Sequence, residues 1–354
     1  MEKFGKSQSV RRTEDLRFLT GQGRYVDDIA PADALHAFFL RSTVAHGAIA
    51  TLDVDDARAM PGVHMVLTVA DLEAAGLNIA MGASLVKNRD GSSGADPVRP
   101  VLAKDHVRHV GEAVAMIVAD NIAAAKDAAE AVLLEIDDLP VHMALAPGGP
   151  ALHVEAADNL AFDWGMGDEA ATQAAIDAAA HVITLNLPDN RIIVNSMEPR
   201  GCYAEITDGR IHVAFGGQGV WGTKSDLARF LGIDKADIRV TNPDVGGGFG
   251  MKGMRYPEYY TVAYAARELG RSVRWMSERT EAMLTDNAGR DLMTTATLAF
   301  DADHRITAYH LDTVANMGAY NSQFAQAIQT ELFSKVLMGT YDVQTAYMLS
   351  LIHI

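Results

Sequence analysis

The sequence contains a single cysteine, Cys202, among its 354 residues. One thiol cannot form an internal disulfide, and it cannot supply the several thiolates of an iron–sulfur cluster or a cysteine-rich zinc site. The absence of disulfides favours a reducing compartment, and we expect a cytoplasmic protein. Long hydrophobic runs are also missing, because no stretch approaches the roughly 20 apolar residues of a membrane helix. No membrane span is therefore expected.

Basic residues are scarce relative to acidic ones. Thirty Lys and Arg stand against 46 Asp and Glu, which gives a formal net charge of −16. Such a surface repels phosphate backbones, so nucleic acid is excluded as an expected partner. The apolar fraction of 49% is that of an ordinary globular protein, and the length predicts two or three domains.

Strand and helix signals alternate, which predicts a mixed α/β fold. In the clearest unit, Ala113–Ala119 is a continuous apolar run typical of a buried strand. Asp120 is the expected N-cap of a helix whose apolar face extends from Ile122 to Leu133. Leu134–Ile136 is expected to begin the next strand, so this segment predicts a β-α-β unit.

The Pro- and Gly-rich stretch from Pro140 to Pro150 disfavours regular structure and predicts a domain boundary near residue 145. Helix signals after it include a Thr223 cap with a Gly232 end, and a Pro257 start with a Gly270 end. Met293–Phe300 and Arg305–Val314 flank a short polar turn and predict a β-hairpin.

Two glycine-rich segments, Gly216–Gly222 and Gly246–Gly253, are the strongest candidates for a binding site. Glycine allows positive φ and a close approach of ligand to backbone, and free N–H groups before a helix bind anions. Both segments contain G-x-G-x-x-G, and Asp244 follows the first one at the spacing of a dinucleotide site. A nicotinamide- or flavin-binding dehydrogenase is therefore one hypothesis. The downstream hairpin argues against it, because a dinucleotide-binding domain continues with further β-α units.

The segment Met197–Arg200 places an acid and a base around a proline, for which we favour an ion pair that fixes a loop. Together with other segments it resembles the large subunit of the molybdenum hydroxylases, a family that includes xanthine dehydrogenase, aldehyde oxidase and aerobic carbon monoxide dehydrogenase. The similar segments occur in the family's order: Gly21–Ile29, Arg41–Ile49, Val107–Ala115, Met197–Arg200, Gln218-Gly219 and Gly246–Lys252.

The resemblance implies an α/β hammerhead domain over residues 1–145, followed over residues 146–354 by the first molybdopterin-binding domain, incomplete at its C-terminus. It implies molybdenum held by molybdopterin, in the cytosine dinucleotide form. By analogy, the Gln218 side chain hydrogen-bonds an oxo ligand of the metal, and Phe249 shapes the substrate side. The cofactor-binding residues implied in this way are Gln218, Gly219, Gly247, Gly248, Phe249 and Gly250.

The implied enzyme hydroxylates or oxidises a small substrate (an aldehyde, an N-heterocycle or CO) with oxygen derived from water. Its electrons would leave through an iron–sulfur small subunit with [2Fe-2S] clusters and a medium subunit with FAD. Gly253 stands where purine-oxidising relatives carry glutamate, which disfavours a xanthine substrate. The family's general-base glutamate would lie beyond Ile354, and Leu349–Ile354 does not resemble the family. We therefore expect a truncated chain that is inactive alone. A non-catalytic fragment that binds partner subunits is a third hypothesis.

Overall fold

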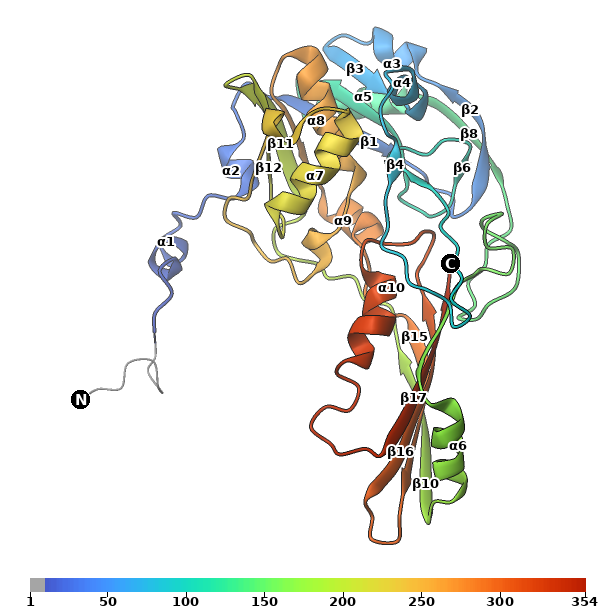
Figure 1. Ribbon diagram of the computed structural model, residues 1–354. Helices are drawn as coiled ribbons and strands as arrows, with labels where there is room; N and C mark the ends of the chain where they lie inside the picture. Colours follow the sequence, from blue (N-terminus) through green and yellow to red (C-terminus); the bar gives the residue numbers. More distant parts are fainter. Residues whose placement is uncertain (1–9) are drawn as a thin grey trace, which may run out of the picture.

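The computed structural model describes residues 10–354, so the first nine residues of the expected first domain lie outside it. The fold is mixed α/β, as expected, with its two largest sheets in different regions of the molecule (Figure 1). Among the helices in residues 10–354, none is both long enough and apolar enough to cross a bilayer.

The larger sheet has seven strands that come from both sides of the Pro- and Gly-rich stretch. The two sets of strands meet where Leu35 and His36 pair in parallel with Val273 and Arg274. Segments before and after residue 145 therefore share one sheet. In spatial order its strands are β13 (Ile238–Thr241), β12 (Arg210–Phe215), β11 (Gly201–Thr207), β14 (Val273–Met276), β1 (Leu35–Arg41), β7 (Ala113–Ala119) and β3 (Val63–Leu67).

Strand β7 is buried along its whole length, as its apolar run predicts. Successive side chains of a strand point to opposite faces of the sheet, and here both faces are covered. Met116 and Val118 join the main core, which includes helix α8 (Pro257–Leu269). Ile117 packs on the other face, in a cluster that includes helix α5 (Ile122–Glu130).

The start of α5 differs from the prediction. The N-cap is Asn121, whose side chain accepts a hydrogen bond from the Ala124 N–H at 3.0 Å. Asp120 instead contacts the His64 ring, with 2.7 Å between its carboxylate and Nε2. Ile122 is 40% exposed, so the predicted apolar face is also wrong at its first residue. Both residues have cap-forming side chains, and the contact with His64 decides between them.

The strand after α5, β8 (Leu133–Asp138), does not complete a β-α-β unit with β7. It pairs antiparallel with β2 in a separate sheet, where Leu134 and Ile136 pack towards Val107 and Val114. Leu133 is 52% exposed, contrary to the prediction. The three-stranded sheet has the order β6 (His106–Val107), β2 (Gly47–Asp53) and β8, and a two-stranded sheet joins β4 (Ala80–Met81) to β5 (Arg99–Pro100).

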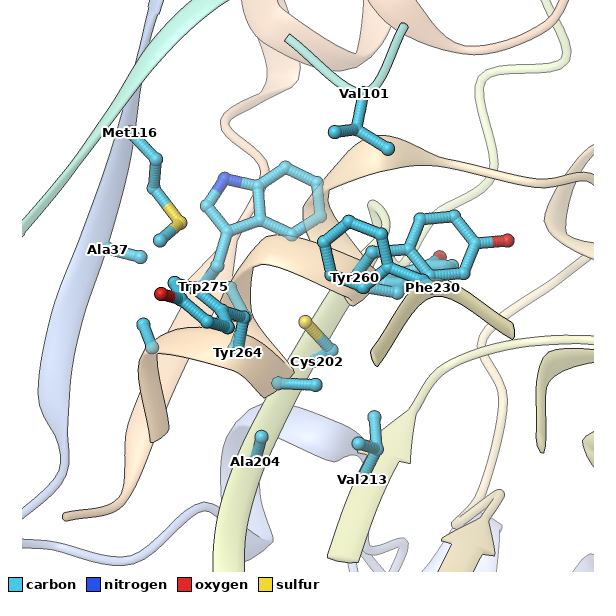
Figure 2. Packing of buried hydrophobic residues seen from close by; sticks show 14 of the residues in the cluster. Ala37, Val101, Met116, Cys202, Ala204, Val213, Phe230, Tyr260, Tyr264 and Trp275 are labelled. Carbon is cyan, nitrogen blue, oxygen red and sulfur yellow. The ribbon is translucent and has the colours of Figure 1, made fainter. Parts of the chain in front are cut away.

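The main core lies between the seven-stranded sheet and two helices, α8 and α7 (Val220–Leu231). Figure 2 shows the aromatic rings of Phe230, Tyr260 and Trp275 around the buried thiol of Cys202. Both helices end as predicted at a glycine in the left-handed region, Gly232 with φ 66° and Gly270 with φ 61°. Pro257 begins α8, also as predicted.

The second large sheet extends away from this core (Figure 1). It contains the predicted hairpin, whose turn is closed by the Asp301 carboxylate accepting the N–H groups of Asp303 and Arg305, each at 2.9 Å. Helix α6 (Glu169–Asp177) packs against its strands. In spatial order the strands are β10 (His181–Asp189), β15 (Leu292–Phe300), β16 (Ile306–Asn316), β17 (Thr345–His353) and β9 (Leu160–Gly167).

Short helices connect these elements. They are α1 (Asp15–Leu19), α2 (Val26–Ile29), α3 (Asp55–Ala59), α4 (Val69–Ala74), α9 (Arg279–Thr285), α10 (Ala325–Ala327), the 3₁₀ turns η1 (Lys235–Asp237) and η2 (Met251–Gly253), and the π-helical turn η3 (Ile328–Leu332).

Candidate functional site

The first glycine-rich segment is the turn between β12 and α7. The N-cap of α7 is Gly219, with φ 99°, and no side chain caps the helix. The first N–H groups of a helix have no partner within it, so they remain available to an anion. The prediction that Thr223 caps this helix is wrong: Thr223 lies inside α7 and its hydroxyl donates back to the Gly219 carbonyl at 3.3 Å.

This turn belongs to a local β-α-β unit, since β12 and β13 pair in parallel across α7. The unit does not continue as a dinucleotide-binding sheet, because β13 is the edge strand and β11, on the other side of β12, is antiparallel. Asp244 is also engaged elsewhere. Its carboxylate pairs with Arg17 and accepts the Arg24 N–H at 2.7 Å. The glycine-rich motif on which the dehydrogenase hypothesis rests is therefore present, but residues 10–354 do not form the parallel sheet of a dinucleotide-binding domain around it.

The second glycine-rich segment, Gly246–Gly253, crosses the first at Gln218. The Gly250 N–H donates to Gln218 Oε1 at 2.8 Å, and the Gln218 N–H donates to the Lys252 carbonyl at 3.2 Å. A Cβ added to Gly248 would lie 2.6 Å from Gln218 Oε1. Glycine at Gly248 thus leaves the space that the Gln218 side chain occupies.

The side-chain amide of Gln218 has an unused donor. Its oxygen is occupied by the Gly250 N–H, which also fixes which end of the amide is oxygen. Its Nε2 makes no hydrogen bond to any other residue in the described part of the chain, and the residue is exposed. Both hydrogens of this NH₂ group can therefore be donated to an acceptor atom of a ligand.

The cavity next to Gln218 has a volume of about 430 Å³. Gln218, Gly219 and Gly250 lie at one side of it. Half of the remaining wall residues are apolar or aromatic, and a charged pair also borders the cavity, with 2.7 Å between Arg255 Nε and Asp226 Oδ2. The apolar and aromatic wall residues are Met254, Tyr259, Tyr260, Phe324, Ile328 and Leu332.

None of these six wall residues was predicted from the sequence as part of the site, and three of them come from a distant segment. Phe324, Ile328 and Leu332 come from α10 and η3, a short irregular helix about a hundred residues after Gln218. The four-residue spacing between them was the available signal, since it places apolar side chains on one helical face. Nothing in that spacing identifies which part of the molecule the face contacts.

The remaining predicted residues lie near this cavity with different exposure. Gly247 has φ 99°, and a Cβ there would lie 2.8 Å from the Phe249 ring. Phe249 is 78% exposed, with φ 50°. The six predicted residues are thus brought into one region, with Gln218, Gly219 and Gly250 on the cavity wall and Gly247, Gly248 and Phe249 adjoining in the same segment.

The two charges of the Met197–Arg200 segment form ion pairs, but not with each other. Glu198 pairs with Lys252, with 2.8 Å between Oε2 and Nζ. Arg200 is fully buried and pairs with Glu258 at 2.8 Å and Asp286 at 2.6 Å. The prediction of an ion pair within this segment is therefore wrong: Glu198 pairs at the second glycine-rich segment, and Arg200 pairs with two carboxylates in the core.

The Arg200 cluster joins β11, α8 and the end of α9. Glu258 accepts from both Arg200 and Arg41, and the Arg200 guanidinium stacks 3.7 Å from the Tyr256 ring centroid. Burial by itself would raise the pKa of Glu258, but the two guanidinium groups lower it to about 2. The cluster is fixed as a charged unit beside the start of α8.

The residues at the cavity fit an anionic cofactor that carries its own metal ligands. In residues 10–354 there is no group of three His, Cys, Asp or Glu side chains placed to bind a metal ion. The side chains and backbone supply donors instead: the Gln218 amide and the first turn of α7. A Cβ at Gly219, Gly222 or Gly250 would meet no atom within 4 Å, so this edge of the cavity is open to a bulky ligand.

Comparisons with known proteins identify both parts of the chain. Residues 20–140 match the aldehyde oxidase and xanthine dehydrogenase a/b hammerhead domain, and residues 152–352 match the molybdopterin cofactor-binding domain. The nicotine 6-hydroxylase large subunit of Paenarthrobacter nicotinovorans is 35% identical, over 95% of this chain and 41% of that protein. The carbon monoxide dehydrogenase large chain of Hydrogenophaga pseudoflava is 33% identical, over 94% and 42%.

The solved structure of quinoline 2-oxidoreductase from Pseudomonas putida 86 superposes with a TM-score of 0.85 and 33% identity, over 98% of this chain and 44% of that one. The chain thus spans less than half the length of these relatives. The hammerhead and molybdopterin-binding folds inferred from sequence are confirmed. The chain belongs to the molybdenum hydroxylase large-subunit family, which includes xanthine dehydrogenase and carbon monoxide dehydrogenase.

Proposed function

We propose that this chain is the molybdenum-cofactor-binding part of a cytoplasmic hydroxylase that oxidises a small organic substrate. The observation that carries the proposal is the free NH₂ group of Gln218, a residue that is held by the Gly250 N–H and that lines a cavity of about 430 Å³. Such a preorganised donor suits an acceptor atom on a bound cofactor. When bound, molybdopterin supplies two-electron oxidation with oxygen from water.

Six residues are assigned to binding the cofactor. Gln218 donates its amide hydrogens, Gly219 leaves the N-terminus of α7 uncapped, and Gly250 orients Gln218. Gly247 and Gly248 keep the second segment free of side chains, and Phe249 is available to cover the substrate side. We propose the cytosine dinucleotide form from the resemblance to the family, and the free N–H groups of α7 can receive the pyrophosphate of such a dinucleotide.

The cavity favours an organic substrate over CO. Six of its wall residues are apolar or aromatic, and the part of this wall that the cofactor leaves free would contact an apolar ring more favourably than a diatomic gas. Of the proposed substrate classes, an N-heterocycle fits this wall best and an aldehyde is the alternative. Nicotine and quinoline, named in two relatives, are compounds of the favoured class.

Electrons from the oxidation must leave through redox groups that lie outside these 354 residues. Cys202 is the chain's one cysteine and is buried, so these 354 residues cannot hold an iron–sulfur cluster through cysteine ligands. We propose a small subunit with [2Fe-2S] clusters and a medium subunit with FAD. We also propose that residues 1–145 and 146–354 form the two family domains, although their strands share one sheet.

The test uses the protein isolated from its native host together with any subunits that remain bound. Molybdenum is measured by mass spectrometry, and the pterin is identified by the nucleotide released on hydrolysis. Dye reduction is then followed with quinoline, an aromatic aldehyde and CO. Stoichiometric molybdenum and released CMP are expected, and quinoline-dependent turnover is expected only where the isolated protein also carries the family's general-base glutamate. Bound NAD or FAD on this chain without molybdenum would refute the proposal in favour of a dehydrogenase. A partner subunit without any cofactor on this chain would favour a non-catalytic fragment.

A further inference from the structure

The Glu198 carboxylate lies between the two glycine-rich segments and contacts both. Its Oε2 accepts the Gly246 N–H and the Lys252 ammonium, each at 2.8 Å. Lys252 has no exposed surface, and the Glu198 side chain is 11% exposed. A charge pair with so little access to water is screened weakly, so its geometry is strongly constrained.

Side chains would crowd this carboxylate on both sides, severely at Gly246 and more mildly at Gly216. A Cβ on Gly246 would lie 2.4 Å from the Glu198 Cβ, and a Cβ on Gly216 would lie 3.1 Å from its Oε2. Gly216 belongs to the first glycine-rich segment and Gly246 to the second. These two glycines of the candidate binding segments, neither of which is among the residues assigned to the cofactor, therefore make room for Glu198.

Lys252 connects this carboxylate to Gln218, because its ammonium pairs with Glu198 and its backbone contacts Gln218. The Lys252 carbonyl accepts the Gln218 N–H at 3.2 Å, and the Lys252 N–H donates to the Gly248 carbonyl at 3.3 Å. Fixing Lys252 therefore fixes the turn from Gly248 to Gly253, which includes the Gly250 N–H that orients the Gln218 amide.

Glu198 is itself held by a rigid loop. Its N–H donates to the Gly246 carbonyl at 3.1 Å, and its carbonyl accepts the Ser196 hydroxyl at 2.8 Å. Arg279 donates to the carbonyls of Ser196 at 2.7 Å and Met197 at 2.8 Å. The loop is thus attached to α9 and to the second glycine-rich segment at once.

We propose that Glu198 is a positioning residue that acts through Lys252, holding the segment Gly246–Gly253 in the shape that directs the Gln218 amide at the cofactor. The role of Gln218 rests on the proposed function, whereas the effect on the segment does not. Glu198 contacts neither cofactor nor substrate in this assignment. Its effect is transmitted through the Lys252 ion pair and the Gly246 N–H.

The first test measures amide hydrogen exchange in protein stripped of cofactor. In Glu198→Gln, which keeps size and an acceptor oxygen, exchange in residues 246–253 is expected to become at least about tenfold faster. The reference is residues 113–119 of β7, where exchange should stay unchanged. The matched control is Glu73→Gln, which breaks an exposed pair with Lys104 that has the same kind of contact at 2.7 Å. Unchanged exchange in residues 246–253 would overturn the proposal.

A double variant separates positioning from general stability. Lys252→Met combined with Glu198→Gln removes both charges, so no unpaired charge remains buried and the chain is expected to fold even where either single variant does not. The ion pair between residues 198 and 252 is still absent, so exchange in residues 246–253 should again be fast, and the molybdenum content of the loaded protein should be low. Wild-type exchange in that segment would show that the pair only balances charge. Fast exchange with normal molybdenum would leave the segment effect standing and refute the link to cofactor binding.

Discussion

At the scale of single residues, the site depends on small groups that leave room for larger ones. Gly248 has no side chain where Gln218 needs space, and Gly246 has none where Glu198 packs. A glycine costs roughly 0.5–1 kcal/mol of stability in regular structure through backbone entropy. In this loop that cost is offset by contacts that any side chain would prevent.

The first prediction concerns Gly248→Val. The new Cβ would lie 2.6 Å from Gln218 Oε1, so the flexible Gln218 side chain must move and its bond from the Gly250 N–H is lost. We expect a folded protein that has lost most of its molybdenum, as measured by metal content per chain and by circular dichroism. The control is Gly253→Ala, whose Cβ would make an ordinary contact of 3.6 Å with Gln218. Equal molybdenum in both variants would contradict the assignment of Gln218.

At the scale of elements, helix ends and buried charge clusters decide how segments are joined. The cap of α5 lies at Asn121, and the Arg200 cluster ties β11 to α8 and to the end of α9. Both features are polar groups whose partners come from elsewhere in the chain or from the first turn of a helix. Their loss is expected to affect stability more than binding.

For the cap, Asn121→Ala should lower the free energy of unfolding by about 1 kcal/mol, because the Ala124 N–H loses its acceptor. Asp120→Ala removes only a partly exposed contact with His64 and should cost less, about 0–1 kcal/mol. Urea denaturation of the two variants compares them directly. A larger loss for Asp120→Ala would mean that the sequence-based cap was the right one.

For the charge cluster, Arg200→Met should lower the free energy of unfolding by about 3–5 kcal/mol, because Glu258 and Asp286 stay buried without their partner. The matched control is Arg89→Met. Arg89 pairs with Asp163 at 2.7 Å but is 40% exposed, so its loss should cost at most about 1 kcal/mol. Similar urea midpoints for the two variants would argue against a buried network at Arg200.

At the scale of the whole molecule, acidic charge and one buried carboxylate set the response to pH. Glu258 has its pKa lowered to about 2 from an ordinary 4.5, so the unfolded chain binds the proton more readily than the folded one. Its contribution to stability is therefore present above pH 4.5 and is lost as the pH falls towards 2. The full difference is on the order of 3 kcal/mol.

We expect the urea midpoint to decrease as the pH is lowered from about 5 to about 3. The slope of the free energy of unfolding against pH over this interval should include roughly one proton that Glu258 takes up on unfolding. In Glu258→Gln the protein should be less stable at neutral pH, and the slope over this interval should be shallower by that proton. Titration monitored by tryptophan fluorescence at several urea concentrations measures both. An unaltered slope in the variant would show that Glu258 does not titrate with a lowered pKa.

The amino-acid sequence by itself determined the elements whose signals are local. β7 occupies the residues of the apolar run Ala113–Ala119, Pro257 and Gly270 delimit α8, and Asp301 closes the predicted hairpin. In each case an apolar run, or the backbone conformation that one residue favours, is enough to predict the element, so the prediction needs no knowledge of distant contacts. The family could also be recognised from sequence, because several short segments occur in the right order.

The tertiary structure decided everything that depends on residues far apart in the chain. β8 pairs in a different sheet from β7, and Glu198 forms its ion pair with Lys252 rather than with Arg200. Part of the cavity wall comes from Phe324 and from residues after it. Each outcome selects one partner among several of similar chemistry. Side-chain type fixes which kinds of contact are favourable, whereas packing of the whole chain fixes which partner is within reach.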